Sequence, residues 1–211
     1  MLAWHFLRED GSTWKDSGYF PPVGGVERHS ESLELCRSGL HASQRALDAL
    51  RYASGPIVRR VELSGEIIEG DDKVCASVRR ELWRFDATDI LHEFARWCAI
   101  GAVIGYWPDA PEVIRRWLAT GDESLRFAIG DAARTATRTT PQSTAAMSSA
   151  RHATWQVAWD AARRAAWDAA GVAAWGTTGD AAWYAAWGTA WAAMNSKLES
   201  MLLDARRKEL C

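Results

Sequence analysis

The chain has 211 residues, of which 48% are hydrophobic and 25% are charged, and its formal net charge is −2. This composition is typical of a globular protein that buries a core, and it excludes a disordered chain. The nearly balanced charge argues against nucleic acid as a partner, because a nucleic-acid interface needs a strongly basic surface.

The N-terminal residues lack the basic segment and the apolar core of a signal peptide. No apolar run approaches the roughly 18 residues of a membrane span. We therefore expect a cytoplasmic protein without a membrane partner. The four cysteines could form two disulfides, but in a cytosolic chain we expect buried thiols. Because they form no CxxC pair, we expect no zinc site. They are Cys36, Cys75, Cys98 and Cys211.

The first fifty residues predict two strands and one short helix. Residues 3–7 form a short apolar run that stops at a Glu-Asp-Gly turn. Residues 15–32 are rich in Gly, Pro and Ser and predict an ordered loop. Residues 33–43 predict a strand with a kink at Gly39, and Ser43 is then the expected cap of a helix over residues 44–53.

The next forty residues predict two further strands and a long helix. Residues 57–63 are rich in β-branched side chains and end at a Ser-Gly step, and residues 78–85 alternate enough to form another strand. Asp86 or Thr88 is the expected cap of a helix with one apolar side. Strands followed by a closing helix predict an α+β domain.

The second half of the chain changes character. We place a mixed α/β domain at residues 1–106 and an all-helical region at residues 107–211. Pro111 lies in the first turn of a predicted helix that ends at Gly121, and a further helix begins at Asp122.

Residues 143–194 repeat a four-residue pattern: one large residue, one variable residue and two small ones. Four residues overshoot one helical turn by about 40°, so a single helix would point its tryptophans in every direction. A break at Gly176–Gly179 instead predicts two antiparallel helices, each with its indoles on one side. The predicted interface residues are Trp155, Trp159, Trp167, Trp183, Trp187 and Trp191.

These helices are apolar or alanine on nearly every side, so they need neighbours on more than one side. An intramolecular bundle, a homo-oligomer and a protein partner all satisfy that need, and the sequence leaves the three open. A membrane-surface role is disfavoured because the polar edge is not rich in Lys or Arg.

No strong catalytic signature is present: there is no GxSxG, no HExxH and no phosphate-binding Gly-rich loop. The five histidines include no pair at the spacing of metal ligands on a helix. The acidic turn at residues 69–72 has the chemistry to hold a cation, although such turns are usually only solvated. We therefore expect no metal site.

The segments Gly39-Leu-His-Ala-Ser43, Ala46-Leu-Asp-Ala-Leu50 and Arg60-Val-Glu-Leu-Ser-Gly65 resemble an uncharacterised family of phage, prophage and bacterial hypothetical proteins. The resemblance covers most of residues 1–105 and implies a mobile-element context rather than an activity. The first interpretation is therefore a non-enzymatic accessory protein without a cofactor. Its N-terminal domain would recognise a partner, and its Ala/Trp helices would pack or oligomerise.

The same segments also resemble the core of the ADP-ribosyltransferases, in the branch with a His–Tyr–Glu triad. Leu2-Ala-Trp-His5 is similar to the family's first strand, whose His contacts the nicotinamide-side ribose of NAD. His41 stands where the family has its Tyr, and the strand with Glu81 resembles the one that bears the catalytic Glu. This resemblance implies NAD as a cofactor, with His5, His41 and Glu81 as catalytic residues and Tyr52 as a cofactor-binding residue. The sequence leaves open whether the protein is an enzyme.

Overall fold

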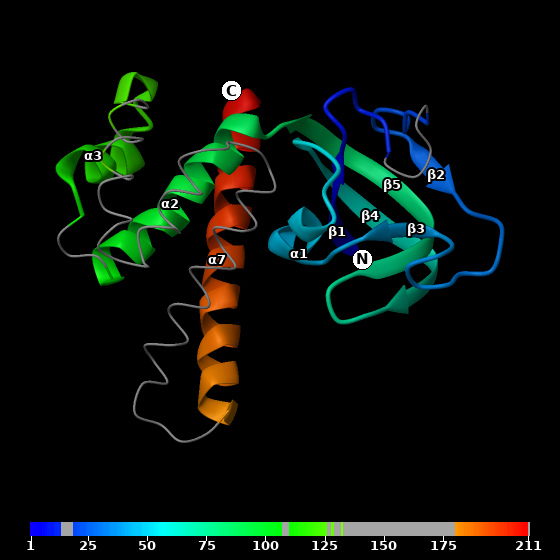
Figure 1. The fold of residues 1–211 in the computed structure, drawn as a ribbon. Coiled ribbons are helices and arrows are strands. Elements are labelled where there is room, and N and C mark those ends of the chain that lie inside the picture. Colours follow the sequence, from blue (N-terminus) through cyan, green and yellow to red (C-terminus); the bar gives the residue numbers. More distant parts are fainter. Residues whose placement is uncertain (14–18, 107–109, 126–127, 129–131, 133–179, 211) are drawn as a thin grey trace. The chain divides into compact units, whose positions relative to one another are not determined.

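The computed structural model describes residues 1–13, 19–106, 110–125, 128, 132 and 180–210 (Figure 1). Its architecture is an antiparallel sheet in the N-terminal part followed by helices, which confirms the α+β prediction. The chain forms two compact units, one made of Met1–Thr88 with Leu198–Cys211, the other of Asp89–Lys197. No helix in the described ranges is long and apolar enough to cross a membrane.

The sheet is built around a long hairpin of β4 (Ile57–Glu69) and β5 (Val74–Asp86). β1 (Leu2–Leu7) pairs with β4, whereas β2 (Val26–Arg28) and β3 (Leu40–Ala42) both pair with β5, and every pairing is antiparallel. Figure 1 labels these strands on the ribbon.

The hairpin is longer than predicted at both strands. β4 does not end at Ser64-Gly65 but continues through a register shift there, because Gly65 adopts a φ of 76° that lets the chain bulge and resume pairing. A Cβ at Gly65 would lie 2.2 Å from the Ser77 Oγ, so this site requires glycine. The turn expected at residues 69–72 does connect the strands, and the Gly70 amide donates to the Lys73 carbonyl oxygen at 2.8 Å.

Two short elements differ from the predictions. The strand expected over residues 33–43 is limited to β3, preceded by a tight turn in which the Ser38 amide donates to the Glu34 carbonyl oxygen. The loop expected over residues 15–32 contains β2, whose three residues are too few to leave a periodic signal.

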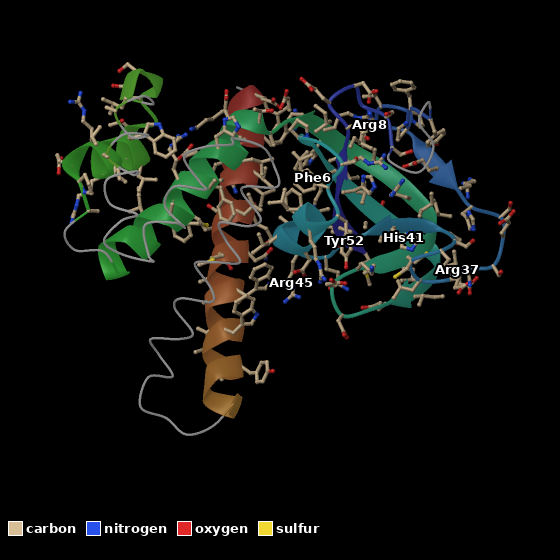
Figure 2. The ribbon with its side chains drawn as sticks, viewed as in Figure 1. Phe6, Arg8, Arg37, His41, Arg45 and Tyr52 are labelled. Carbon is tan, nitrogen blue, oxygen red and sulfur yellow. The ribbon has the colours of Figure 1, made fainter. Side chains whose placement is uncertain are left out.

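Helix α1 (Ala46–Arg51) is shorter than predicted, and Ser43 does not cap it. The residue at its N-cap is Arg45, which makes no capping hydrogen bond through its side chain, and Tyr52 stands at its C-cap (Figure 2). Ser43 instead forms a β-bridge with Trp4, and their backbone amides and carbonyls bond reciprocally at 2.7 and 3.0 Å. This pairing joins the segment before α1 to the free side of β1.

Helix α2 (Thr88–Tyr106) begins where the sequence predicts, and α3 (Glu112–Thr120) ends at the predicted Gly121, with Pro111 at its N-cap. The Thr88 amide donates to Asp86 Oδ1 at 2.8 Å, which confirms Asp86 as the cap of α2. Gly121 ends α3 with a left-handed φ of 69°. The next element is the short 3₁₀ helix η1 (Glu123–Leu125).

Helix α7 (Asp180–Glu209) is the last element of the chain. The predicted break at Gly176–Gly179 lies outside the described residues, together with Trp155, Trp159 and Trp167. Within the described residues α7 carries Trp183, Trp187 and Trp191, which confirms a helix there, and it continues well beyond the end of the repeat.

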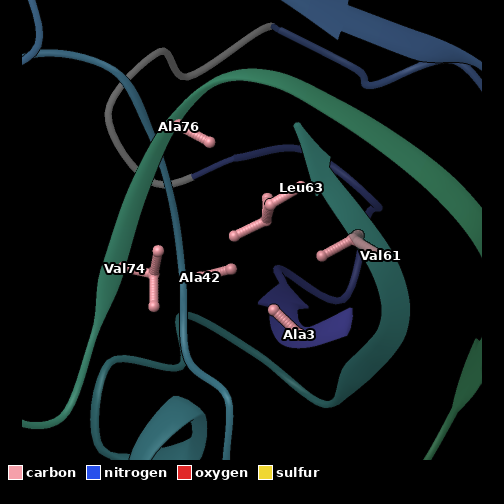
Figure 3. Packing of buried hydrophobic residues seen from close by; sticks show 6 residues of the cluster. All are labelled: Ala3, Ala42, Val61, Leu63, Val74 and Ala76. Atoms are coloured by element: carbon pink, nitrogen blue, oxygen red, sulfur yellow. The ribbon is translucent and has the colours of Figure 1, made fainter. Parts of the chain in front are cut away.

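The apolar core is distributed over both units. One cluster lies on the sheet and consists of Ala3, Ala42, Val61, Leu63, Val74 and Ala76 (Figure 3). Another lies between helices and consists of Ala99, Ala110, Ile114, Trp117 and Leu118. Ile114, Trp117 and Leu118 form the inner side of α3, as the sequence predicts.

Candidate functional site

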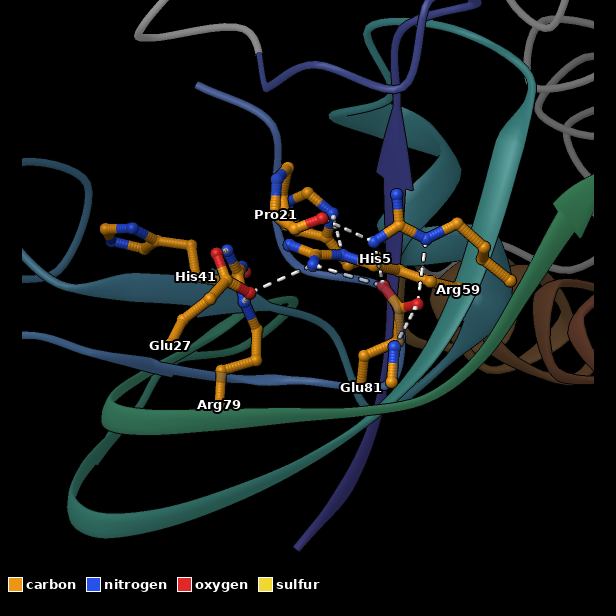
Figure 4. Close-up of polar contacts among 9 residues, drawn as sticks. His5, Pro21, Glu27, His41, Arg59, Arg79 and Glu81 are labelled. Atoms are coloured by element: carbon orange, nitrogen blue, oxygen red, sulfur yellow. Dashed lines mark hydrogen bonds and ion pairs between the residues drawn. The ribbon is translucent and has the colours of Figure 1, made fainter.

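A group of charged side chains lies in the interior of the N-terminal unit. We call it the charged cluster, and its members are His5, Glu27, Arg59, Arg79, Glu81 and Arg84 (Figure 4). Strands β1, β2, β4 and β5 contribute its members. Fully buried charges are rare unless they are paired, so the cluster is the first candidate for a functional site.

The sheet register places the cluster on one face. His5 pairs with Arg59 across β1 and β4, and Arg59 pairs with Arg84 across β4 and β5. Side chains of directly paired residues point to the same side of a sheet, so these three share a face. We call this side the charged face. Trp4 and Arg60, one position along each strand, point to the opposite side, which we call the aromatic face.

A bulge brings Glu81 to the charged face as well. Glu81 and Arg84 are three residues apart, and in a regular strand they would point to opposite faces. The register shifts between Arg60 and Val61, so that Arg60 pairs with Trp83 but Val61 pairs with Glu81. The extra residue in β5 restores Glu81 to the side of Arg84. Their side chains then form a two-pronged ion pair, with Arg84 Nε and Nη2 donating to Glu81 at 2.8 and 2.6 Å.

Glu27 is the second acidic member of the charged cluster, and it accepts hydrogen bonds from both Arg59 and Arg79. Arg79 donates to it through Nε and Nη2, both at 2.9 Å, and Arg59 donates through Nη1 at 2.9 Å. The Arg59 guanidinium also lies 3.5 Å from Glu81, so it links the two carboxylates. The side chains of Glu27, Arg59 and Arg79 are at most 5% exposed, so water screens these ion pairs very little.

Burial and neighbouring charge shift the pKa values in this cluster. Burial, together with the charge of Arg79, lowers the pKa of Arg59 to about 10. Burial by itself raises the pKa of Glu27, but the hydrogen bonds and charge of Arg79 and Arg59 outweigh it and hold the pKa below its usual value. The pKa of His5 is lowered well below its usual value, first by burial and then by the positive charge of Arg59. His5 is therefore a neutral imidazole at physiological pH.

The remaining contacts attach a loop to the cluster. The Gly24 amide donates to Glu81 Oε1 at 3.2 Å, and Arg84 Nη2 donates to the Pro21 carbonyl oxygen at 2.8 Å. Glu81 therefore has both oxygens engaged, by Arg84 and Gly24 on one side and by Arg59 on the other.

The four residues that the ADP-ribosyltransferase resemblance singles out do not form one group of side chains. His5 and Glu81 both contact Arg59. The His41 imidazole instead accepts from the Cys36 amide at 2.9 Å, and its carbonyl oxygen, not its ring, accepts from Arg79. Figure 2 locates His41 on β3 and Tyr52 at the end of α1.

Tyr52 belongs to a separate surface group with the acidic turn. Its hydroxyl donates to Asp72 Oδ2 at 2.6 Å, Arg51 donates to the same oxygen at 2.7 Å, and the Lys73 ammonium lies 4.2 Å from the Tyr52 ring centre. Asp72 is thus committed to neighbouring side chains. Within the described ranges no group of His, Cys, Asp and Glu has the arrangement of a metal site.

The cysteines of the described chain are free thiols, but one of them differs from the prediction. Cys75 and Cys98 are buried, whereas Cys36 is exposed. Cys36 lies in the turn before β3, where its backbone has a φ of 74°, and a turn at the surface cannot cover the side chain. Burial raises the pKa of Cys98 to about 12, so that thiol stays protonated.

Sequence reasoning missed Glu27, Arg59, Arg79 and Arg84. One signal was present: Arg59 interrupts a β-branched strand at a position that alternation assigns to the inner side. A charged residue at such a position predicts a buried partner, but it does not say which of the many carboxylates supplies it.

A further contact joins the end of α7 to the same unit. Glu199 Oε1 accepts hydrogen bonds from Trp4 Nε1 at 3.0 Å and from the Ala46 amide at 3.2 Å. Ala46 is the first residue of α1, so Glu199 supplies the N-terminal cap that Arg45 does not. Leu198 and Leu202, on the same side of α7, are fully buried.

Comparison with known proteins finds one similarity. Residues 1–93 match the model of a domain of unknown function (DUF7666). The matched part contains the strands β1 to β5 of the sheet. No curated protein and no solved structure matches the chain significantly.

Proposed function

We propose that this protein is a non-enzymatic accessory protein of phage or mobile-element type. Its sheet domain recognises a partner or ligand, and its Ala/Trp helices pack or assemble the chain. The observation that carries this proposal is the state of Glu81, the only acidic member of the triad that the transferase resemblance implies.

Glu81 is held as a structural carboxylate. Both of its oxygens accept from Arg84, one also accepts from the Gly24 amide, and the side chain is 1% exposed. A carboxylate that stabilises an oxocarbenium-like transition state has to face the ribose with a free oxygen. Exposing Glu81 would break a buried two-pronged ion pair, which costs about 3–5 kcal/mol.

The assembly part of the proposal is supported by helix α7. Trp187 and Trp191 stack with ring centroids 5.7 Å apart and an interplanar angle of 13°, which produces a flat aromatic surface on one side of the helix. The same helix is joined through Glu199 to Trp4 and α1.

Incubation of the full chain with NAD tests the non-enzymatic proposal. We expect no release of nicotinamide above the rate in buffer, and the same result for Glu81→Gln. Nicotinamide release by the natural chain that Glu81→Gln abolishes, while Glu62→Gln on the exposed side of β4 leaves it unchanged, would contradict the proposal.

Measurement of the solution mass of the full chain tests assembly. We expect a species larger than the 23.4 kDa monomer whose share grows with protein concentration. Trp187→Glu should shift the population towards the monomer, whereas Thr189→Glu, on an exposed position of the same helix, should not. A strict monomer at every concentration would remove the assembly part.

The second candidate is an NAD-dependent ADP-ribosyltransferase-like enzyme that uses His5, His41 and Glu81. One observation favours it: His5 and Glu81 lie on the same face of the sheet and share Arg59 as a neighbour. Tyr52 has its hydroxyl on Asp72 and its ring beside Lys73, so it fits a nicotinamide poorly. The nicotinamide measurement separates the two candidates.

A further inference from the structure

The three arginines of the charged cluster differ in how one edge of the guanidinium is used. Nε and Nη2 form an edge that matches the two oxygens of a carboxylate. Arg79 directs this edge at Glu27, and Arg84 directs it at Glu81. Arg59 directs Nε at His5 Nδ1, at 3.1 Å, and its buried Nη2 has no hydrogen-bond partner in the described parts of the chain.

The two carboxylates of the cluster do not complete this edge of Arg59, because their oxygens are already engaged. Glu27 accepts from Arg79 twice and from Arg59 Nη1, and Glu81 accepts from Arg84 twice and from Gly24. Three arginines face two glutamates, so the formal charge of the cluster is one unit positive while His5 is neutral. Excess charge and an unsatisfied donor are both unfavourable in the interior.

We infer that the buried Nη2 of Arg59, which has no hydrogen-bond partner among the described residues, is the binding site for a small oxyanion of phosphate or carboxylate chemistry. An oxyanion supplies the negative charge that the cluster lacks and the acceptor oxygen that Nη2 lacks. The inference rests on the proposed binding function and names the ligand class that the sheet domain takes.

His5 holds the guanidinium of Arg59 in place at this site. Its Nδ1 accepts the Arg59 Nε–H, so the proton of the neutral ring is assigned to Nε2, which points away from Arg59. A neutral imidazole satisfies Nε without neutralising the charge of Arg59, so that charge and Nη2 remain available to an anion.

Tyr19 connects the cluster with the protein surface. Its side chain is 43% exposed, and its hydroxyl lies within electrostatic reach of Glu27, Arg79 and Arg59. The residues that follow Tyr19 contact the cluster through the Pro21 carbonyl and the Gly24 amide. The segment of Tyr19 to Gly24 therefore borders the proposed site.

Thermal unfolding of the full chain in inorganic phosphate, in acetate and in chloride of equal ionic strength tests the inference. We expect a saturable rise in Tm with phosphate, with acetate or with both, beyond any effect of chloride. A response to phosphate alone assigns phosphate chemistry to the ligand, and a response to acetate alone assigns carboxylate chemistry. Equal curves in all three salts would overturn the site.

Two variants locate the effect. Arg59→Gln should weaken the response at least about tenfold, because it removes the charged edge. Arg80→Gln should keep the full response, because Arg80 is an exposed residue of β5 whose ion pair with Glu62 lies outside the cluster. An equal response from natural chain and Arg59→Gln would place the anion elsewhere and overturn the inference.

A direct measurement covers the case in which Arg59→Gln does not fold. The NMR signals of the Arg59 Nε–H and of the His5 ring should move with the anion in the natural chain, with the saturation seen in the Tm. Unmoved signals would contradict the site even if the Tm rose. Nicotinamide release by a chain that also binds phosphate would remove the proposed non-enzymatic function and leave this site standing.

Discussion

The two faces of the same three strands stabilise the protein in different ways. On the aromatic face, Trp4 contacts Trp83 edge to face at 5.7 Å, Trp83 stacks on Phe85, and the Arg60 guanidinium lies 4.3 Å from the Trp4 ring centre. Burial of large apolar surfaces dominates these contacts, so small changes can be absorbed by repacking. On the charged face each group needs a particular partner at a particular distance.

The difference teaches where specificity resides in this fold. Apolar contacts on either face stabilise any side chain of suitable size that becomes buried. The arginine–glutamate pairs can form in only one register of β2, β4 and β5, because a shift of one residue would point Arg59 or Arg79 to the opposite face. The charged face therefore fixes the pairing of the strands, whichever ligand it binds.

Glu27→Gln should produce the largest effect, because it leaves Arg59 and Arg79 buried without their common carboxylate. We expect a loss of about 3–5 kcal/mol in the free energy of unfolding, measured by urea denaturation. The matched control is Glu62→Gln, since Glu62 is an exposed carboxylate whose ion pair with Arg80 is long, at 3.7 Å. That control should lose less than about 0.5 kcal/mol. Similar losses for both variants would contradict the difference between the faces.

The sequence predicted the parts of this fold that depend on local signals. The β-branched run at Ile57 predicted β4, Asp86 predicted the start of α2, and Gly121 predicted the end of α3. The alanine-rich tetrads predicted a helix over Trp183, Trp187 and Trp191. Each of these features is decided by residues within one helical turn or one strand.

The predictions that were wrong concern features that depend on residues far away in the chain. Strand β2 is held to β5 by Glu27 and Arg79, which are 52 residues apart. The cap of α1 comes from Glu199, which is 153 residues beyond Ala46, so local inspection selected Ser43 instead. The bulge that brings Glu81 to the charged face depends on how β4 and β5 pair. The sequence of either strand by itself therefore does not predict it.

Glu199→Ala tests the aromatic face and should have the next largest effect. The variant leaves the Trp4 indole N–H and the Ala46 amide without their acceptor, so we expect a loss of about 1–3 kcal/mol in the free energy of unfolding. Glu199→Gln keeps one acceptor oxygen and should lose less. Ser196→Ala, on the exposed side of α7, is the control and should be nearly neutral. Equal stability of Glu199→Ala and the control would show that α7 adds nothing to the cap of α1.

The pH dependence of stability tests the neutral state of His5. Its pKa is lower in the folded protein than in the unfolded chain, so below pH of about 6.5 the unfolded chain binds more protons. The contribution of His5 is therefore complete above that pH and decreases as the pH falls towards the folded pKa.

We expect a loss of about 1 kcal/mol between pH 7.5 and pH 5.5 that His5→Gln removes, measured by urea denaturation at both pH values. Because His5 is half-buried, this is less than the limit of about 1.4 kcal/mol per pH unit for one proton. His92→Gln, outside the charged cluster, should keep the full pH dependence. An identical slope for the natural chain and His5→Gln would mean that the imidazole titrates normally.

Arg60→Met should have the smallest effect, although Arg60 is the immediate neighbour of Arg59. On the aromatic face Arg60 has a cation–π contact with Trp4, worth about 0.5–1 kcal/mol, and a buried Nη1 without a hydrogen-bond partner in the described residues. Methionine keeps the packing of the stem and removes the cost of that buried donor, so gain and loss nearly cancel. We expect a change within about 0.5 kcal/mol, whereas Arg59→Met should lose about 3–5 kcal/mol because Glu27 and Glu81 lose their shared cation. Comparable losses from these two adjacent arginines would mean that both faces depend on charge, and the contrast between them would fail.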